Sequence, residues 1–113
     1  MKLLVLVLNK EEFLDEILEA FVEVGISGAT IIDSVGMGHK LAYDIPIFAG
    51  LRKSLKTSDY NKTIFSVVKD DETLEEAIRI IGEIIDLNEV GTCLLFVVPL
   101  LLVKGLKERD LTW

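Results

Sequence analysis

Residues 2–8 read Lys-Leu-Leu-Val-Leu-Val-Leu, and only Lys2 is polar. A near-continuous apolar run of this length predicts a strand that is buried on both faces or central in a sheet. Asn9 follows, and Glu12 stands three residues later, which is the spacing of a capping box. We therefore expect a helix to begin at Asn9, directly after the first strand.

The next elements continue this alternation. Apolar residues recur at helical spacing after Asn9, and Gly25 is placed to end the helix in a left-handed conformation. Residues 29–35 are rich in β-branched side chains and predict a second strand, and residues 63–69 predict a third. The stripe of the first helix consists of Phe13, Leu14, Ile17, Leu18, Phe21 and Val22.

The last part of the chain predicts one more helix and strand. Thr73 and Glu76 have capping-box spacing, and a second apolar stripe follows them. Residues 94–98 predict the fourth strand, which Pro99 bends or ends because proline donates no ladder hydrogen bond. Residues 100–103 are apolar and could continue as a short edge strand.

The resulting order, β-α-β-β-α-β, predicts an α+β protein of the ferredoxin-like class. Right-handed crossovers place both helices on one face of a four-stranded antiparallel sheet. We expect a single domain over residues 1–105 and a C-terminal tail over 106–113. The opposite face of so apolar a sheet should be covered by other subunits.

Composition agrees with an oligomer and excludes several classes of protein. Half of the residues are hydrophobic, an excess typical of obligate homo-oligomers, and the net charge of -7 argues against a nucleic-acid binder. The longest apolar run, 93–103, is too short to span a membrane as a helix, and acidic residues 11–16 stand where a signal peptide would be cleaved. One cysteine makes a disulfide framework impossible, so we expect a cytoplasmic protein.

The connection between the second and third strands is long and apolar. Surface loops are normally polar, and structureless connections beyond about 12–15 residues tend to be functional. We expect residues 41–62 to hold a short helix packed on its own or a neighbouring subunit, and to present a docking surface for a protein partner. Its apolar residues are Ile45, Pro46, Ile47, Phe48 and Leu51, and its basic cluster is Arg52, Lys53, Lys56 and Lys62. That cluster suits an anionic ligand or acidic partner, or is simply the solvated face of a helix.

Three segments, in this order, resemble the nitrogen-regulatory PII superfamily of small signalling proteins. They are Gly25-Ile-Ser-Gly28-Ala-Thr30 before the second strand, Gly36-Met-Gly38 at the start of the long connection, and Glu89-Val-Gly91-Thr-Cys-Leu-Leu-Phe96-Val-Val-Pro99. The resemblance implies a homotrimer whose sheets pack around an axis. It also implies an adenine nucleotide as a candidate ligand, bound in clefts between subunits, with phosphates held by the glycine loops.

By that resemblance, this chain would be a divergent member of the PII superfamily. The family pattern Gly-Asp-Gly-Lys stands here as Gly91-Thr92-Cys93-Leu94, without the second glycine and the lysine. His39-Lys40 replaces a glutamine that the family carries after its Gly-x-Gly pair. Tyr43 and Tyr60 lie in the connection, where some relatives carry a modified tyrosine, but their surroundings favour ordinary packing or surface roles.

The candidate ligand-binding residues follow from this placement, each with a simpler alternative. Glycines allow backbone amides to approach an anion, and they equally permit a tight bend. His39 could ligate a metal with Asp33 or Asp44, or be a solvated residue, and we assign no metal site; Cys93 reads as a small buried hydrophobe. The residues assigned to the cleft are Gly36, Gly38, His39, Lys40, Gly91 and Thr92.

Three functions remain open on the sequence. The first is a regulatory protein that binds a small anionic effector and modulates a partner through residues 39–62. The second is a trimeric interaction module without a ligand, and the third is a metal-responsive protein similar to the CutA family. We expect no enzyme activity, because no Ser/His/Asp or Cys/His set has a catalytic spacing, and the loop at Asn9-Lys10-Glu11 lacks the arginine of acylphosphatases.

Overall fold

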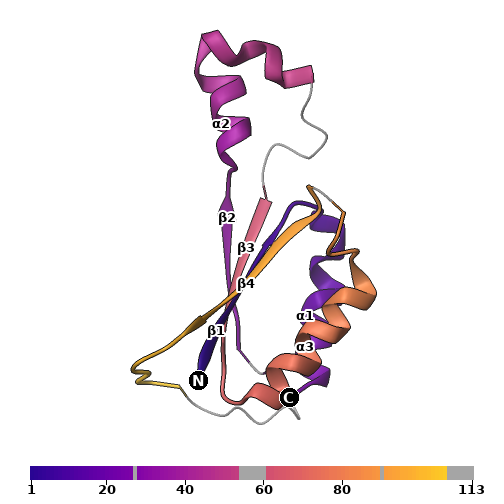
Figure 1. Ribbon diagram of the computed structural model, residues 1–113, viewed down its shortest axis with the longest axis vertical. Coiled ribbons are helices and arrows are strands. Elements are labelled where there is room, and N and C mark those ends of the chain that lie inside the picture. The colour runs from indigo at the N-terminus through magenta and orange to yellow at the C-terminus, as the bar shows by residue number, and fades with distance from the viewer. Residues whose placement is uncertain (27, 54–60, 90, 107–113) are drawn as a thin grey trace.

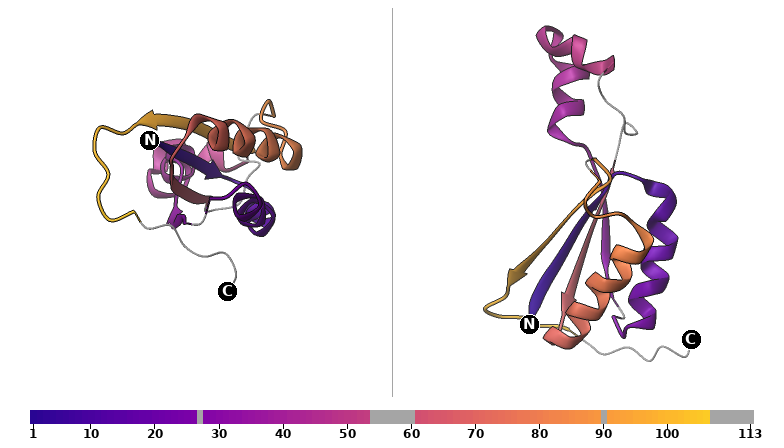
Figure 2. Two further views of the ribbon diagram at one scale, coloured as in Figure 1. Left: turned by 90° about the horizontal axis from the view of Figure 1, so that it is seen from below. Right: turned by 45° about the vertical axis from the view of Figure 1, so that its right-hand side comes forward.

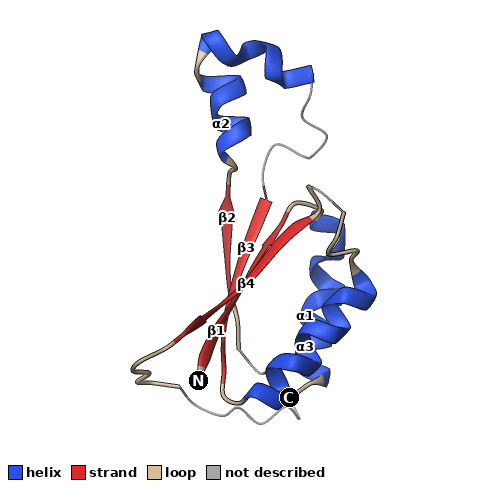
Figure 3. Ribbon diagram, in the orientation of Figure 1, coloured by secondary structure: helices blue, strands red, loops and turns tan. Residues whose placement is uncertain are grey.

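A computed structural model describes residues 1–26, 28–53, 61–89 and 91–106, with the side chains of residues 51–53 outside the description. Four strands form one antiparallel sheet in the order β2-β3-β1-β4 (Figure 1). The strands are β1 (Lys2–Leu8), β2 (Thr30–Ser34), β3 (Asn61–Val68) and β4 (Cys93–Pro99). The helices are α1 (Leu14–Glu23), α2 (Met37–Asp44) and α3 (Asp71–Ile84), with 3-10 turns η1 (Glu11–Phe13) and η2 (Pro46–Lys53) (Figure 3).

This order confirms the ferredoxin-like fold class. β1 pairs with both β3 and β4, and β2 pairs with β3, so the two central strands are β1 and β3. The most apolar run of the sequence therefore lies in the middle of the sheet, where a strand is covered most completely.

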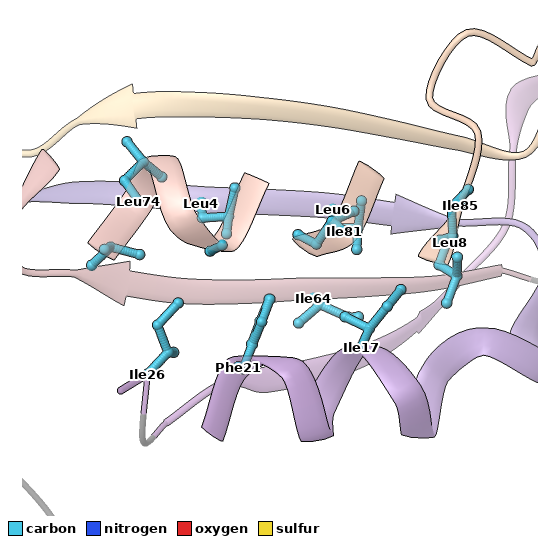
Figure 4. Packing of buried hydrophobic residues seen from close by; sticks show 12 residues of the cluster. Leu4, Leu6, Leu8, Ile17, Phe21, Ile26, Ile64, Leu74, Ile81 and Ile85 are labelled. Carbon is cyan, nitrogen blue, oxygen red and sulfur yellow. The ribbon is translucent and has the colours of Figure 1, made fainter. Parts of the chain in front are cut away.

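The hydrophobic core lies between one sheet face and helices α1 and α3. Figure 2 shows both helices on the same side of the sheet, and Figure 4 shows their apolar side chains meeting those of β1 and β3. Leu6, Ile17 and Ile81 are completely buried there. Burying such side chains contributes about 1.5–3 kcal/mol each, so this layer is the main source of hydrophobic stabilisation among the described residues.

The ends of the helices differ from the capping predictions at two places. The first helix enters through η1, whose N-cap residue is Lys10 without a side-chain cap, and the Asn9 oxygen predicted to cap it accepts from Asn61 instead. α3 is capped one residue before its start, where Asp70 accepts a 2.7 Å hydrogen bond from the Thr73 amide. The prediction for Gly25 is confirmed, since its φ of +92° is a left-handed conformation.

The second face of the sheet carries apolar side chains, and no helix of the described residues covers it. Phe96 and Leu94 of β4 are 43% and 59% exposed on this face. They stand opposite Val5 and Val7 of β1 in the antiparallel register. We call this surface, made by alternate residues of all four strands, the bare face.

The chain after β4 corrects another prediction. Residues 100–103 do not continue as a strand, and Leu101 is fully exposed. The Leu100 amide donates to the Met1 carbonyl at 3.2 Å, so the chain is held only at the start of this segment. Most of the predicted tail, 107–113, lies outside the described residues.

Residues 37–53, which we call the arm, extend beyond the end of the sheet (Figure 1). α2 continues the direction of β2 and packs against η2, and the arm makes the molecule 49 Å long. The expected helical structure in this connection is present. Of the two alternatives predicted for its apolar residues, packing on their own subunit does not describe Ile47, which is 83% exposed, and packing on a neighbouring subunit stays a prediction.

Candidate functional site

The residues predicted to bind a ligand come from two segments that meet at one end of the sheet. In the strand register, Leu8 is opposite both Lys62 and Cys93, and Ser34 is opposite Asn61. Gly36 follows Ser34, and Gly91 and Thr92 precede Cys93. We call this the arm end of the sheet, because the arm also starts there.

The two glycine segments use their glycines differently. Gly91 has a φ of +85°, which residues with a side chain rarely adopt, so the turn before β4 requires glycine. Gly36 precedes α2 with a φ of −77°, which any residue can adopt, and an added Cβ would lie 3.9 Å from Nδ2 of Asn61. Gly38 lies in the first turn of α2. The first turn of a helix points its backbone amides toward the helix N-terminus, where an anion can accept from them.

His39 and Lys40 engage partners within their own helix. The His39 ring stacks on Tyr43 with 4.4 Å between the ring centroids. Lys40 Nζ lies 2.5 Å from Asp44 Oδ2. This hydrogen-bonded ion pair raises the pKa of Lys40 and lowers the pKa of Asp44. Both side chains are on the arm, and an anion at the arm end must compete with Asp44 for Lys40.

Two further lysines at the arm end also have carboxylate partners. Lys62 forms a hydrogen-bonded ion pair with Asp33, and its Nζ lies 3.3 Å from Glu11 Oε1. The hydrogen bonds to Asp33 and Glu11 raise the pKa of Lys62. Lys10 Nζ lies 3.5 Å from Glu89 Oε1, in the loop before β4. A phosphate group would therefore bind here by replacing a carboxylate partner.

A row of polar side chains joins the two glycine segments, and sequence reasoning missed it. Asn9 donates to the Gly91 carbonyl at 2.9 Å, and Asn61 donates to Asn9 at 3.0 Å. Ser34 hydrogen-bonds to Asn61 and lies 2.7 Å from the Thr63 hydroxyl. Their position in the sequence could have revealed them, since each stands at or near the end of a strand in an otherwise apolar sheet.

Thr92 has a buried hydroxyl. The residue is 2% exposed, and its Oγ1 has no hydrogen-bond partner among the described residues. Its carbonyl accepts from the Asn9 amide at 3.0 Å, which fixes the backbone at the arm end. Leaving a hydroxyl buried without a partner costs about 1–3 kcal/mol. Thr92 therefore offers an unused donor and acceptor among the described residues, but only to a group that can reach its buried hydroxyl.

Other parts of the described chain offer fewer ligand groups. Burial raises the pKa of the Cys93 thiol, which keeps it protonated and unreactive. No three His, Cys, Asp or Glu side chains converge as metal ligands within the described ranges. A groove of about 290 Å³ lies on the bare face near the start of β1, and Leu3, Phe65, Val67 and Leu106 are among its lining residues.

Comparison with known proteins supports one family. A family model described as nitrogen regulatory protein P-II matches residues 1–109, almost the whole chain. A search of curated proteins finds no match to it. In the described part of the structure, no helix is long and apolar enough to cross a membrane. With its ferredoxin-like sheet and the family match over nearly its full length, the chain belongs to the nitrogen regulatory protein P-II family, as a PII-like regulatory protein.

Proposed function

We propose that this PII-like protein is a cytoplasmic homotrimer that binds a small anionic effector between subunits and passes that signal to a protein partner through the arm. An adenine nucleotide is the leading candidate for the effector. The ligand residues would be Gly36, Gly38, His39, Lys40, Gly91 and Thr92, and the partner-contacting residues Ile45, Pro46, Ile47, Phe48, Leu51, Arg52 and Lys53.

The bare face supports the trimer. Isolated subunits would expose a contiguous apolar surface over all four strands, including Ile32, Phe96 and Val98. Surfaces of this kind mark interaction sites in folded proteins. Packing three such faces together would remove them from water without disturbing the core on the other side of the sheet.

The single observation that carries the effector proposal is the meeting of both glycine segments with the root of the arm. The positive φ of Gly91 shapes the turn before β4, and the first turn of α2 points its backbone amides toward the helix N-terminus, a geometry suited to an anion. Hydrogen bonds through Ser34, Asn61 and Asn9 connect Gly91 to the end of β2, two residues before Gly36. A ligand at the arm end would thus touch the element that must respond to it.

The response would be a shift in population between two arrangements of the arm. A ligand favours one arrangement only by as much as it binds that arrangement more tightly. Exchange of the Lys40–Asp44 ion pair for a Lys40–phosphate contact would supply such a difference, because it frees Asp44 and alters the charge on α2. Exposed Ile47 and Phe48 would then be presented to, or withdrawn from, a partner.

A thermal-shift panel tests the effector. The panel contains ATP, ADP, cyclic di-nucleotides, bicarbonate and divalent metal ions, each added alone to the full chain. We expect a nucleotide to raise the unfolding midpoint by several degrees, since binding to the folded state stabilises it by RT ln(1 + [L]/Kd). Lys40→Ala should remove the shift, whereas the control Lys2→Ala, whose lysine pairs with Asp71 at the other end of β1, should retain it.

One observation favours a second candidate, a trimeric interaction module without a ligand. Lys10, Lys40 and Lys62 each already have a carboxylate neighbour, as expected if no anion normally binds them. No shift with any compound, together with a trimeric mass, would favour this module. A shift with metal ions alone that His39→Ala abolishes would instead indicate a CutA-like response.

A further inference from the structure

The hydrogen bonds at the arm end form one directed chain. The Ser34 hydroxyl donates to Asn61, whose Oδ1 and backbone carbonyl (3.3 Å) both accept from it, and it lies 2.7 Å from the Thr63 hydroxyl, which can donate to Ser34 in turn. Asn61 Nδ2 donates to Asn9 Oδ1 at 3.0 Å, and Asn9 Nδ2 donates to the Gly91 carbonyl at 2.9 Å. Each side chain accepts from one neighbour and donates to the next.

The amide orientations in this chain are forced by their partners. Turning the Asn9 amide over would place its oxygen against the Gly91 carbonyl and its nitrogen against Nδ2 of Asn61. Both contacts would then be repulsive. Because the bonds point the same way, each polarises the next and the chain is cooperative.

The position of the chain in the fold gives it a mechanical consequence. Ser34 is the last residue of β2, where the backbone leaves the sheet for the arm, and Asn61 is the first residue of β3, where it returns. Their contact closes the root of the arm. Asn9, just after β1, connects that root to Gly91 in the loop of residues 86–92.

We propose that Ser34, Asn61 and Asn9 are positioning residues that couple the root of the arm to the 86–92 loop, so that the loop and the arm root open together. When the Ser34 hydroxyl no longer donates to Asn61, the Asn61 amide loses its fixed orientation. The hydrogen bond from Asn61 to Asn9 is then weakened, and so is the hydrogen bond from Asn9 to the Gly91 carbonyl. The coupling is a property of the free protein. It does not depend on the proposed effector, and it would survive if no nucleotide binds.

Hydrogen exchange followed by mass spectrometry tests the coupling by changing one end and observing the other. The variant Ser34→Ala removes the hydroxyl but leaves every direct contact of Gly91 intact. We expect amide exchange in peptides covering residues 86–92 to rise at least about threefold, within the range that loss of one net hydrogen bond produces. Exchange in α3 should not change, which separates local opening from global unfolding. Ser34→Thr should restore the wild-type rate, because it keeps the hydroxyl.

A double variant tests the route. In an Asn9→Ala background, Ser34→Ala should have no further effect on amide exchange in the 86–92 loop, because the proposed coupling passes through the Asn9 side chain. Two matched controls should leave the loop unchanged in the wild-type background. Asp33→Asn alters the neighbouring residue of β2, whose side chain pairs with Lys62. Asn88→Ala removes a loop asparagine whose backbone amide, unchanged by the substitution, donates to Asp86.

Two results would overturn the proposal. One is unchanged loop exchange in Ser34→Ala while the arm root itself exchanges faster. The other is an equal effect of Ser34→Ala with and without Asn9, which would mean that the loop responds by another route.

Discussion

Single residues at the arm end are held by a few polar contacts whose effects can be separated. Thr92 lowers the free energy of unfolding of the free protein, because its hydroxyl is buried without a partner in the described structure. Asn9, Asn61 and Ser34 satisfy one another, so their replacement should have the opposite effect on stability.

Replacing Thr92 with valine should stabilise the free protein. The two side chains have similar shape, and the variant removes the unpartnered hydroxyl, so the free energy of unfolding should rise by about 1 kcal/mol. Urea denaturation measures this change. If the effector uses the hydroxyl, the same variant should show a smaller nucleotide-induced thermal shift. A loss of stability in the free protein would show that the hydroxyl already has a partner.

The cap of α3 should make stability depend on pH. The hydrogen bond from the Thr73 amide lowers the pKa of Asp70, so the ionised side chain is favoured in the folded state. Its contribution is complete above the ordinary aspartate pKa of about 4 and is lost as the pH falls through the lowered folded-state value. Asp70→Ala should therefore lower the unfolding midpoint by about a few degrees at pH 7 and by less near pH 2.

A matched variant checks the origin of this effect. Asp70→Asn keeps an acceptor for the Thr73 amide but cannot titrate, so it should unfold like wild type at low pH and only slightly earlier at neutral pH. A pH-independent difference between Asp70→Ala and wild type would contradict the assignment of the cap.

Among the elements, the arm is the one least connected to the rest of the fold. No described side chain of the arm, residues 37–50, belongs to the core cluster between the sheet and helices α1 and α3. Replacing residues 37–60 with a short glycine-containing turn should thus leave a cooperative domain whose unfolding midpoint falls by no more than about 5 °C. Circular dichroism during heating measures this, and non-cooperative melting would show that the arm supports the core.

The elements of the sheet could be predicted from local pattern, and the arm only in part. The period of the apolar residues identifies buried strands and amphipathic helices, as in residues 2–8 and in the two helical stripes that contain Ile17 and Ile81. The arm is helical but leaves Ile47 exposed, and no pattern in one chain says what covers such a residue.

The candidate site was predicted only in part for a similar reason. The glycines stood out in the sequence because their chemistry is distinctive. Asn9, in contrast, has two possible roles, which are capping a helix and hydrogen-bonding to a distant strand. Only the sheet register, which brings Asn9 beside Asn61 and Gly91, decides between these roles. Thr73 was predicted as the cap of the second helix, but Asp70, three residues earlier, caps it and accepts from the Thr73 amide.

At the scale of the whole molecule, the bare face should control assembly. Light scattering of the purified chain should give three times its monomer mass. Phe96→Asp places a charge on the apolar face, in the middle of β4, and should reduce the mass to that of a monomer, since an unpaired charge is costly in an apolar interface. Val22→Asp, at a comparably exposed apolar position on α1 on the other side of the sheet, should keep the trimeric mass. A monomeric wild type would contradict this account of the bare face.

The central claim is that an anion at the arm end changes the arm. Hydrogen exchange of the wild-type chain, measured with and without saturating ATP, tests it most directly because the readout lies in the responding element. The account predicts that exchange changes together in peptides covering residues 34–44 and 86–92, while β1 and α3 are unaffected. Unchanged exchange in both segments, or a change confined to the 86–92 loop, would contradict it.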